Sequence, residues 1–195
     1  MQSSIKSKPI WIYLSLATLF VLIVALNHFK MDENDTWWNI AMGRWMVQNL
    51  QIYRTEVFSA TGLGRPFIAH EWLSEIIFYL LSSPTGEGLS YFKLVAVMFC
   101  FGVFGLTLAK DYLKGLLTYP LCVAFIVLIS FRASVRPQLF EICCSSALVF
   151  ILDRWQKQKN SRILFWLLPI QLFWVNAHGS YLVGPVFVFL FVCLF

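Results

Sequence analysis

Apolar residues along this chain are gathered into six long runs; residues 28–88 separate the first two, and short polar links separate the others. The runs are Ile10–Asn27, Leu89–Ala109, Leu116–Phe131, Gln138–Leu152, Ile163–Val175 and Tyr181–Phe195. A helix that crosses a bilayer needs about 20 mainly apolar residues, and spans that pack inside a bundle can be shorter. The pattern therefore predicts an all-α fold, a polytopic transmembrane bundle of about six helical spans.

Residues 28–88, between the first two runs, follow a different pattern that predicts two shorter helices. Trp37 to Leu50 reads as an amphipathic helix, with one face formed by Trp37, Trp38, Ala41 and Trp45 and another marked by Asn39, Gly43 and Arg44. Apolar residues recur at helical spacing from Glu71 to Leu81. This second helix is too short to span, so we expect it to lie along the membrane surface.

Composition and charge agree with a membrane protein and set its orientation. Hydrophobic residues make up 59% of the 195 and charged residues 13%, whereas a soluble domain carries about 25% charged residues. Basic clusters lie before the first run, after the second, and between the fourth and fifth. Because cytoplasmic links collect Lys and Arg, the N-terminus is expected inside and residues 28–88 outside. These flanking positives account for the net charge of +5, so we expect membrane lipids as partners and no nucleic acid.

The domain organisation follows from these runs. Residues 10–27 would form the first span, 28–88 a large extracytoplasmic loop, and 89–195 the second to sixth spans. The chain stops at Phe195 inside an apolar run. We therefore expect residues 1–195 to be a single transmembrane domain and the N-terminal portion of a longer protein.

This topology would bring polar residues from three separate links to the outer membrane face. They are Asp32, Glu33, Asp35, His70, Glu71, Glu75, Arg132, Arg136, Asn176 and His178. Charged and polar groups at a membrane face are costly unless they are used or paired. Their convergence predicts a functional site.

Each acidic candidate has two interpretations. Asp35 precedes the first loop helix, where Asp is a favourable N-cap, or it is a general base that takes a proton from an acceptor hydroxyl. Asp32 is either a solvated loop charge or a metal ligand. Glu71 and Glu75 are four residues apart, so they either form a solvated face or hold a cation between them, such as a metal ion, Arg136 or a substrate amine.

The remaining candidates carry positive charge or amide groups. Arg132 and Arg136 either extend to the membrane interface or bind phosphate, and Arg136 is the better phosphate ligand because it lies beside the start of a helix. Asn176 and His178 occur in the tight link Asn-Ala-His-Gly. His178 would bind phosphate or a metal, or would cap a helix end.

Five motifs occur in a fixed order along the chain: D-x-W-W-x-x-A-x-G-x-W from Asp35, T-x-x-F-S-x-T, G-x-P-x-x-x-H-E-W-L-S-E, an R-P before a helix, and W-x-N-x-H-G. This ordered set resembles bacterial polytopic membrane proteins of the C-type glycosyltransferase (GT-C) superfamily, in the branch with mannosyltransferase-like and lipid A-modifying members. The resemblance extends from about Asp32 to Gly184.

The resemblance implies an inverting glycosyltransferase in the bacterial inner membrane, with a polyprenyl-phosphate-linked sugar as donor. It implies that Asp35 is the catalytic base, with Asp32 as second choice, that His70 and Glu71 line the cavity, and that Arg136 contacts the donor phosphate. Sugar and acceptor stay open, and so does a divalent cation as cofactor. The alternative is a non-catalytic membrane subunit or scaffold that binds lipid-linked glycans.

Overall fold

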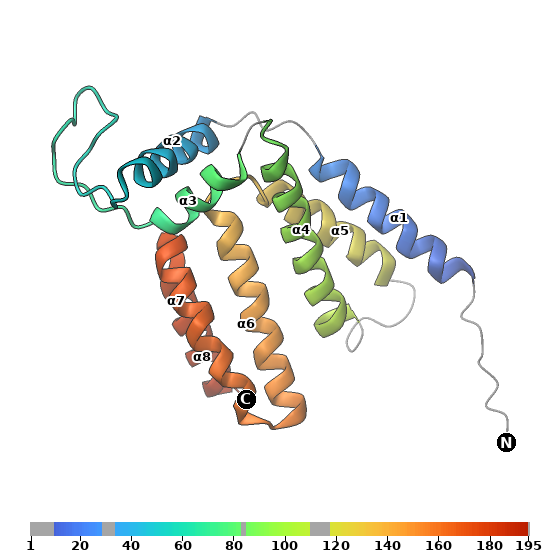
Figure 1. Cartoon of the computed structure of the whole chain (residues 1–195). Helices are drawn as coiled ribbons and strands as arrows, with labels where there is room; N and C mark the ends of the chain where they lie inside the picture. Colours follow the sequence, from blue (N-terminus) through green and yellow to red (C-terminus); the bar gives the residue numbers. More distant parts are fainter. Residues whose placement is uncertain (1–9, 29–33, 83–84, 110–117, 195) are drawn as a thin grey trace, which may run out of the picture.

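The computed structural model describes residues 10–28, 34–82, 85–109 and 118–194, and its regular structure in these ranges is helical (Figure 1). The α-helices are α1 (Ile10–Asn27), α2 (Asn34–Asn49), α3 (Trp72–Leu81), α4 (Glu87–Phe104), α5 (Thr118–Arg132), α6 (Gln138–Gln158), α7 (Leu167–Ala177) and α8 (Val183–Leu194). A π-helical turn, Gly105–Ala109, extends α4, and the short 3₁₀ segments Ser161–Trp166 and Gly179–Leu182 precede α7 and α8. The predicted all-α class is confirmed.

The helices coincide with the apolar runs of the sequence. In the described ranges, α1 has the expected bounds, and each later run is matched by a helix that begins or ends within a few residues. By length and hydropathy, however, only Glu87–Thr107 among the described helices is long and apolar enough to cross a membrane. The segments Tyr13–Asn27, Thr118–Arg132 and Gly179–Leu194 are apolar but shorter.

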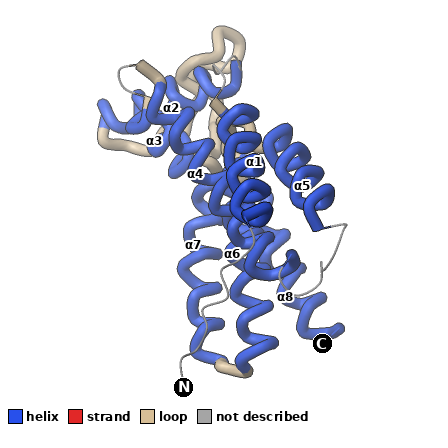
Figure 2. The backbone as a smooth tube through the Cα atoms, turned by 90° about the vertical axis from the view of Figure 1, so that its right-hand side faces the viewer, coloured by secondary structure: helices blue, strands red, loops and turns tan. Residues whose placement is uncertain are grey.

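The helices of the bundle lie side by side, and α2 and α3 lie across one end of it (Figures 1 and 2). One core joins α1, α4 and α5 through buried residues such as Ile23, Val97 and Ile126. A second core lies beneath α3, where the Phe78 ring stacks on Phe140 of α6 at 5.5 Å between ring centroids. This second core holds the helices of residues 28–88 on the end of the bundle.

Helices α2 and α3 cross at a contact that only glycine permits. A Cβ atom at Gly43 would lie 2.0 Å from the backbone oxygen of Glu75, far inside van der Waals contact. This close approach fixes Glu75 directly beneath α2.

The buried face of α2 is not the tryptophan-bearing face that the sequence pattern indicated as apolar. The buried residues are Thr36, Asn39, Ile40, Met42, Gly43 and Met46, whereas Trp37 and Trp38 are 55% and 45% exposed. The expected polar face, which carries Asn39 and Gly43, is the one that packs. Gly43 on this face allows α3 to approach closely.

Candidate functional site

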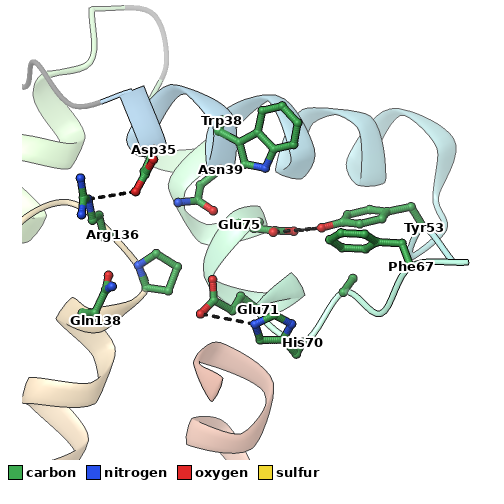
Figure 3. A pocket seen from close by; sticks show the side chains of 12 residues that line it. Asp35, Trp38, Asn39, Tyr53, Phe67, His70, Glu71, Glu75, Arg136 and Gln138 are labelled. Atoms are coloured by element: carbon green, nitrogen blue, oxygen red, sulfur yellow. Dashed lines mark hydrogen bonds and ion pairs between the residues drawn. The ribbon is translucent and has the colours of Figure 1, made fainter. Parts of the chain in front are cut away.

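A cavity of about 240 Å³ lies where α2, α3, the loop between them and the start of α6 meet (Figure 3). Its walls are formed by Asp35, Trp38, Asn39, Tyr53, Phe67, Ala69, His70, Glu71, Glu75, Arg136, Pro137 and Gln138. Five of the residues predicted from the sequence are among them. The cavity therefore collects acidic, basic and aromatic groups that are up to a hundred residues apart in the chain.

Asp35 and Arg136 form an ion pair at one end of this cavity (Figure 3). The Asp35 Oδ2 and Arg136 Nε atoms are 3.4 Å apart, and the side chains are 64% and 37% exposed. Helix α2 begins at Asn34, so Asp35 lies in the first turn of the helix and is not the N-cap that its position had also allowed. Both charges are accessible to a ligand at the cavity rim.

Glu75 is buried in the middle of the cavity wall, with 5% of its surface exposed. Its two carboxyl oxygens lie 3.0 and 2.9 Å from the hydroxyl of Tyr53, which donates to them. Burial raises the pKa of Glu75 to about 7, and the neighbouring Glu71 carboxylate adds to this effect while the Tyr53 hydrogen bond opposes it. A carboxyl with this pKa can accept or release a proton at neutral pH.

Burial also raises the pKa of the Tyr53 phenol, and the charge of Glu75 raises it further. Tyr53 therefore stays protonated and acts as a hydrogen-bond donor. Its ring packs against Phe67 at 5.3 Å between centroids. This aromatic pair forms the end of the cavity opposite Arg136 (Figure 3).

Glu71 is paired with His178, behind the cavity wall. The His178 Nδ1 atom lies 2.5 Å from Glu71 Oε1, and Nε2 lies 3.3 Å from Glu141 Oε2 on α6. The hydrogen bond to Glu71 is the main cause of a raised His178 pKa; burial opposes it, and the charge of Glu141 reinforces it. These carboxylates stabilise the imidazolium form of His178 relative to that of a free histidine, because both ring nitrogens donate in that form.

The sequence left two interpretations of Glu71 and Glu75, a solvated face or a cation held between them; in the structure each carboxyl has its own partner. Glu71 precedes α3 with non-helical backbone angles, φ −113° and ψ 18°. The two carboxyls therefore face different partners, His178 for Glu71 and Tyr53 for Glu75. Among the residues that the structure describes, there is no group of three or more His, Cys, Asp or Glu side chains placed to bind a metal ion.

Two of the other predicted residues, Asn176 and Arg132, lie outside the cavity lining. Asn176 accepts a hydrogen bond from the Trp72 indole at 3.0 Å and thereby ties α7 to α3. Arg132 is exposed at the end of α5. His70 is 61% exposed, with Nε2 3.8 Å from the Glu71 carboxylate, and it does line the cavity. Asp32 lies outside the described residues, as do the basic residues at positions 6, 8, 110 and 114.

Sequence reasoning did not select Tyr53, Asn39, Gln138 or Glu141 as site residues. Tyr53 lies in a loop with no periodic pattern, and Asn39 was assigned to a helix face without the tryptophans. Glu141 carried a usable signal, because a carboxylate within an apolar run needs a partner. His178 is that partner.

Comparison with known proteins finds no relative of this chain. It matches no protein-family model, and neither a curated protein nor a solved structure is detectably similar to it.

Proposed function

We propose that the chain is the membrane-embedded part of a GT-C-like glycosyltransferase that takes a sugar from a polyprenyl phosphate. The observation that carries the proposal is the Asp35–Arg136 pair at the rim of a cavity that also holds Glu75. In this proposal the pair supplies a base and a phosphate ligand within one site. The apolar helix runs beneath the cavity support a lipid-borne donor, with the bundle in the bacterial inner membrane and the cavity on the outer side.

In this proposal Arg136 binds the donor phosphate. A guanidinium forms two parallel hydrogen bonds to phosphate oxygens, and the positive end of the α6 dipole also favours an anion. The phosphate would compete with the Asp35 carboxylate for Arg136. Donor binding would therefore release Asp35 to act as a base.

Asp35 then accepts the proton of an acceptor hydroxyl. The acceptor oxygen attacks the anomeric carbon, and the bond between that carbon and the phosphate oxygen breaks. The electron pair leaves with the polyprenyl phosphate, whose charge Arg136 stabilises. Attack from the face opposite the phosphate inverts the anomeric configuration.

Native mass spectrometry of the purified chain in detergent, with a panel of polyprenyl-phosphate sugars, tests the proposal. We expect the wild type to retain a donor and Arg136→Ala to lose it. Arg132→Ala is the matched control, since this arginine is four residues away and outside the cavity. Equal retention by Arg136→Ala and Arg132→Ala, or no retention by the folded wild type, would contradict the proposal.

A further inference from the structure

Helix α2 has an exposed face that takes no part in the cavity around Asp35 and Arg136. A groove of about 490 Å³ follows this face, bordered by the loop after α2 and by the end of α3. Its walls include three aromatic rings and three polar side chains, those of Trp37, Trp45, Phe58, Arg44, Gln48 and Ser82. These residues are all different from those that line the first cavity. The groove is therefore a second candidate binding site.

Arg44 gives this groove a positive charge. The side chain is exposed, and its guanidinium lies over the Tyr79 ring, 5.8 Å from the ring centroid. It forms no ion pair with a carboxylate that the structure describes, and the described residues of the groove wall include no acidic side chain. A guanidinium stacks on aromatic faces and binds phosphate through two parallel hydrogen bonds. Arg44 is thus placed on Tyr79 to bind an anion, and its geometry favours phosphate.

Gln48 and Ser82 add uncharged hydrogen-bonding groups. Gln48 lies one turn beyond Arg44 on α2 and is also exposed. The Ser82 hydroxyl donates to the Tyr79 carbonyl oxygen at 2.8 Å, so the hydroxyl oxygen can still accept. These groups suit a ligand with hydroxyls, whereas an ammonium group would find no carboxylate among the described residues of the wall. The polar part of the groove therefore favours a net negative, hydroxyl-bearing group over a zwitterionic one.

The aromatic walls and the position of the groove indicate that the ligand is a lipid. Trp37 and Phe58 are 55% and 39% exposed. Trp37 also lines a neighbouring cavity together with Glu87 and Tyr91. These two residues belong to the first turns of α4, where the apolar segment that could cross a membrane begins. Since Trp and Tyr are enriched at the headgroup level of membranes, the groove lies where phospholipid headgroups would be.

We propose that this groove binds an anionic phospholipid with a hydroxyl-bearing headgroup, such as phosphatidylglycerol. Arg44 binds the phosphodiester, Gln48 and Ser82 bind the glycerol hydroxyls of the headgroup, and the aromatic rings pack against the apolar part of the lipid. The site is separate from the cavity at Arg136. It shares with the proposed function only the placement of the bundle in a membrane.

The test is a titration of the full chain in detergent, followed by native mass spectrometry, with phosphatidylglycerol and phosphatidylcholine of the same acyl chains. Both lipids have the same phosphodiester, so a difference reports the charge and the hydroxyls of the headgroup. The wild type should bind phosphatidylglycerol more tightly. Arg44→Gln should weaken that binding about tenfold, the lower end for a hydrogen bond to a charged group because Arg44 is exposed.

The matched control is Arg54→Gln, which removes another exposed arginine of residues 28–88 that lies outside the groove. It should bind phosphatidylglycerol as the wild type does, and both variants should unfold at the same temperature as the wild type. The proposal is overturned if the wild type binds the two lipids equally, or if Arg44→Gln and Arg54→Gln bind phosphatidylglycerol alike.

A cross-test with polyprenyl-phosphate sugars keeps failure of this site distinct from failure of the proposed function. Arg44→Gln should retain the sugar donor and lose phosphatidylglycerol, and Arg136→Ala should do the reverse. Loss of both ligands by Arg44→Gln would indicate one shared site and overturn the proposal. If the wild type binds phosphatidylglycerol through Arg44 but retains no sugar donor, the phospholipid site stands and only the proposed function fails.

Discussion

Replacing His178 by alanine should destabilise the protein at acid pH much more than at alkaline pH. His178 joins Glu71 at the start of α3 to Glu141 on α6 through bonds of 2.5 and 3.3 Å. Hydrogen bonds to charged groups contribute about 1.5–3 kcal/mol each. The two carboxylates are 22% and 26% exposed, so water screens part of this. We expect a loss of about 3 kcal/mol at pH 5.5.

The pH dependence has a definite sign. The pKa of His178 is raised in the folded protein, mainly by its hydrogen bond to Glu71. Its stabilising contribution is therefore complete below the pKa of a free histidine, about 6.5, and is lost as the pH rises through the folded-state pKa. Above the folded-state pKa the neutral ring has one N–H for two carboxylates, so the cost of His178→Ala should fall there to about 1 kcal/mol.

Thermal unfolding of the purified protein in detergent, followed by tryptophan fluorescence at pH 5.5 and 9, measures this difference. At about 2–4 °C per kcal/mol for a chain of this size, His178→Ala should lower the Tm by about 6–12 °C at pH 5.5. His70→Ala is the control, since His70 is 61% exposed and 3.8 Å from the same Glu71 oxygen; it should change the Tm little. The reasoning is refuted if the two variants behave alike, or if the His178→Ala loss is the same at both pH values.

Two further predictions concern Glu75 and its support. Because burial raises the Glu75 pKa to about 7, the stability of the wild type should fall as the pH rises from about 4.5 to 7. Glu75→Gln should therefore gain up to about 3 kcal/mol of unfolding free energy relative to the wild type between pH 5 and 8, measured by denaturant unfolding. A difference that stays constant over this pH range would contradict the burial argument. Gly43→Ala should cost about 2 kcal/mol or more, because its Cβ would overlap the Glu75 backbone oxygen. Gly102→Ala, with open space around its Cβ, should lower the Tm by no more than 1 °C, and equal losses at the two glycines would contradict the crossing contact.

The positions of the helices could be predicted because each one follows from local pattern. Long apolar runs separated by polar links gave α1 and the positions of α4 to α8, with at least one end of each helix within a few residues. The two loop helices followed from shorter periodic stretches. The packed face of α2 could not be predicted in this way. The tryptophans dominate its apolar pattern, but the close crossing at Gly43 decides which side is buried.

The site was predictable in part. The predicted topology brought Asp35, Glu71, Glu75 and Arg136 to one place, and the structure has all of them in the cavity wall. Partner choice was not predictable, because it depends on where α3 begins. The non-helical backbone of Glu71 turns its carboxylate toward His178, and Glu75 pairs with Tyr53 instead. Tyr53 belongs to no periodic pattern in the sequence.

The most direct test of the central claim is sugar transfer by the Asp35→Asn variant. Membrane vesicles containing the chain would be supplied with the labelled donor that the wild type retains, and label in acceptor material would be counted. Asp153→Asn, at the other end of α6, is the control. Losing a general base typically costs about 10²–10⁴-fold in rate, so Asp35→Asn should retain at most about one hundredth of the wild-type transfer while still binding donor. Transfer at the wild-type rate by Asp35→Asn would contradict the account, and binding without transfer by the wild type itself would indicate a non-catalytic glycan-binding subunit.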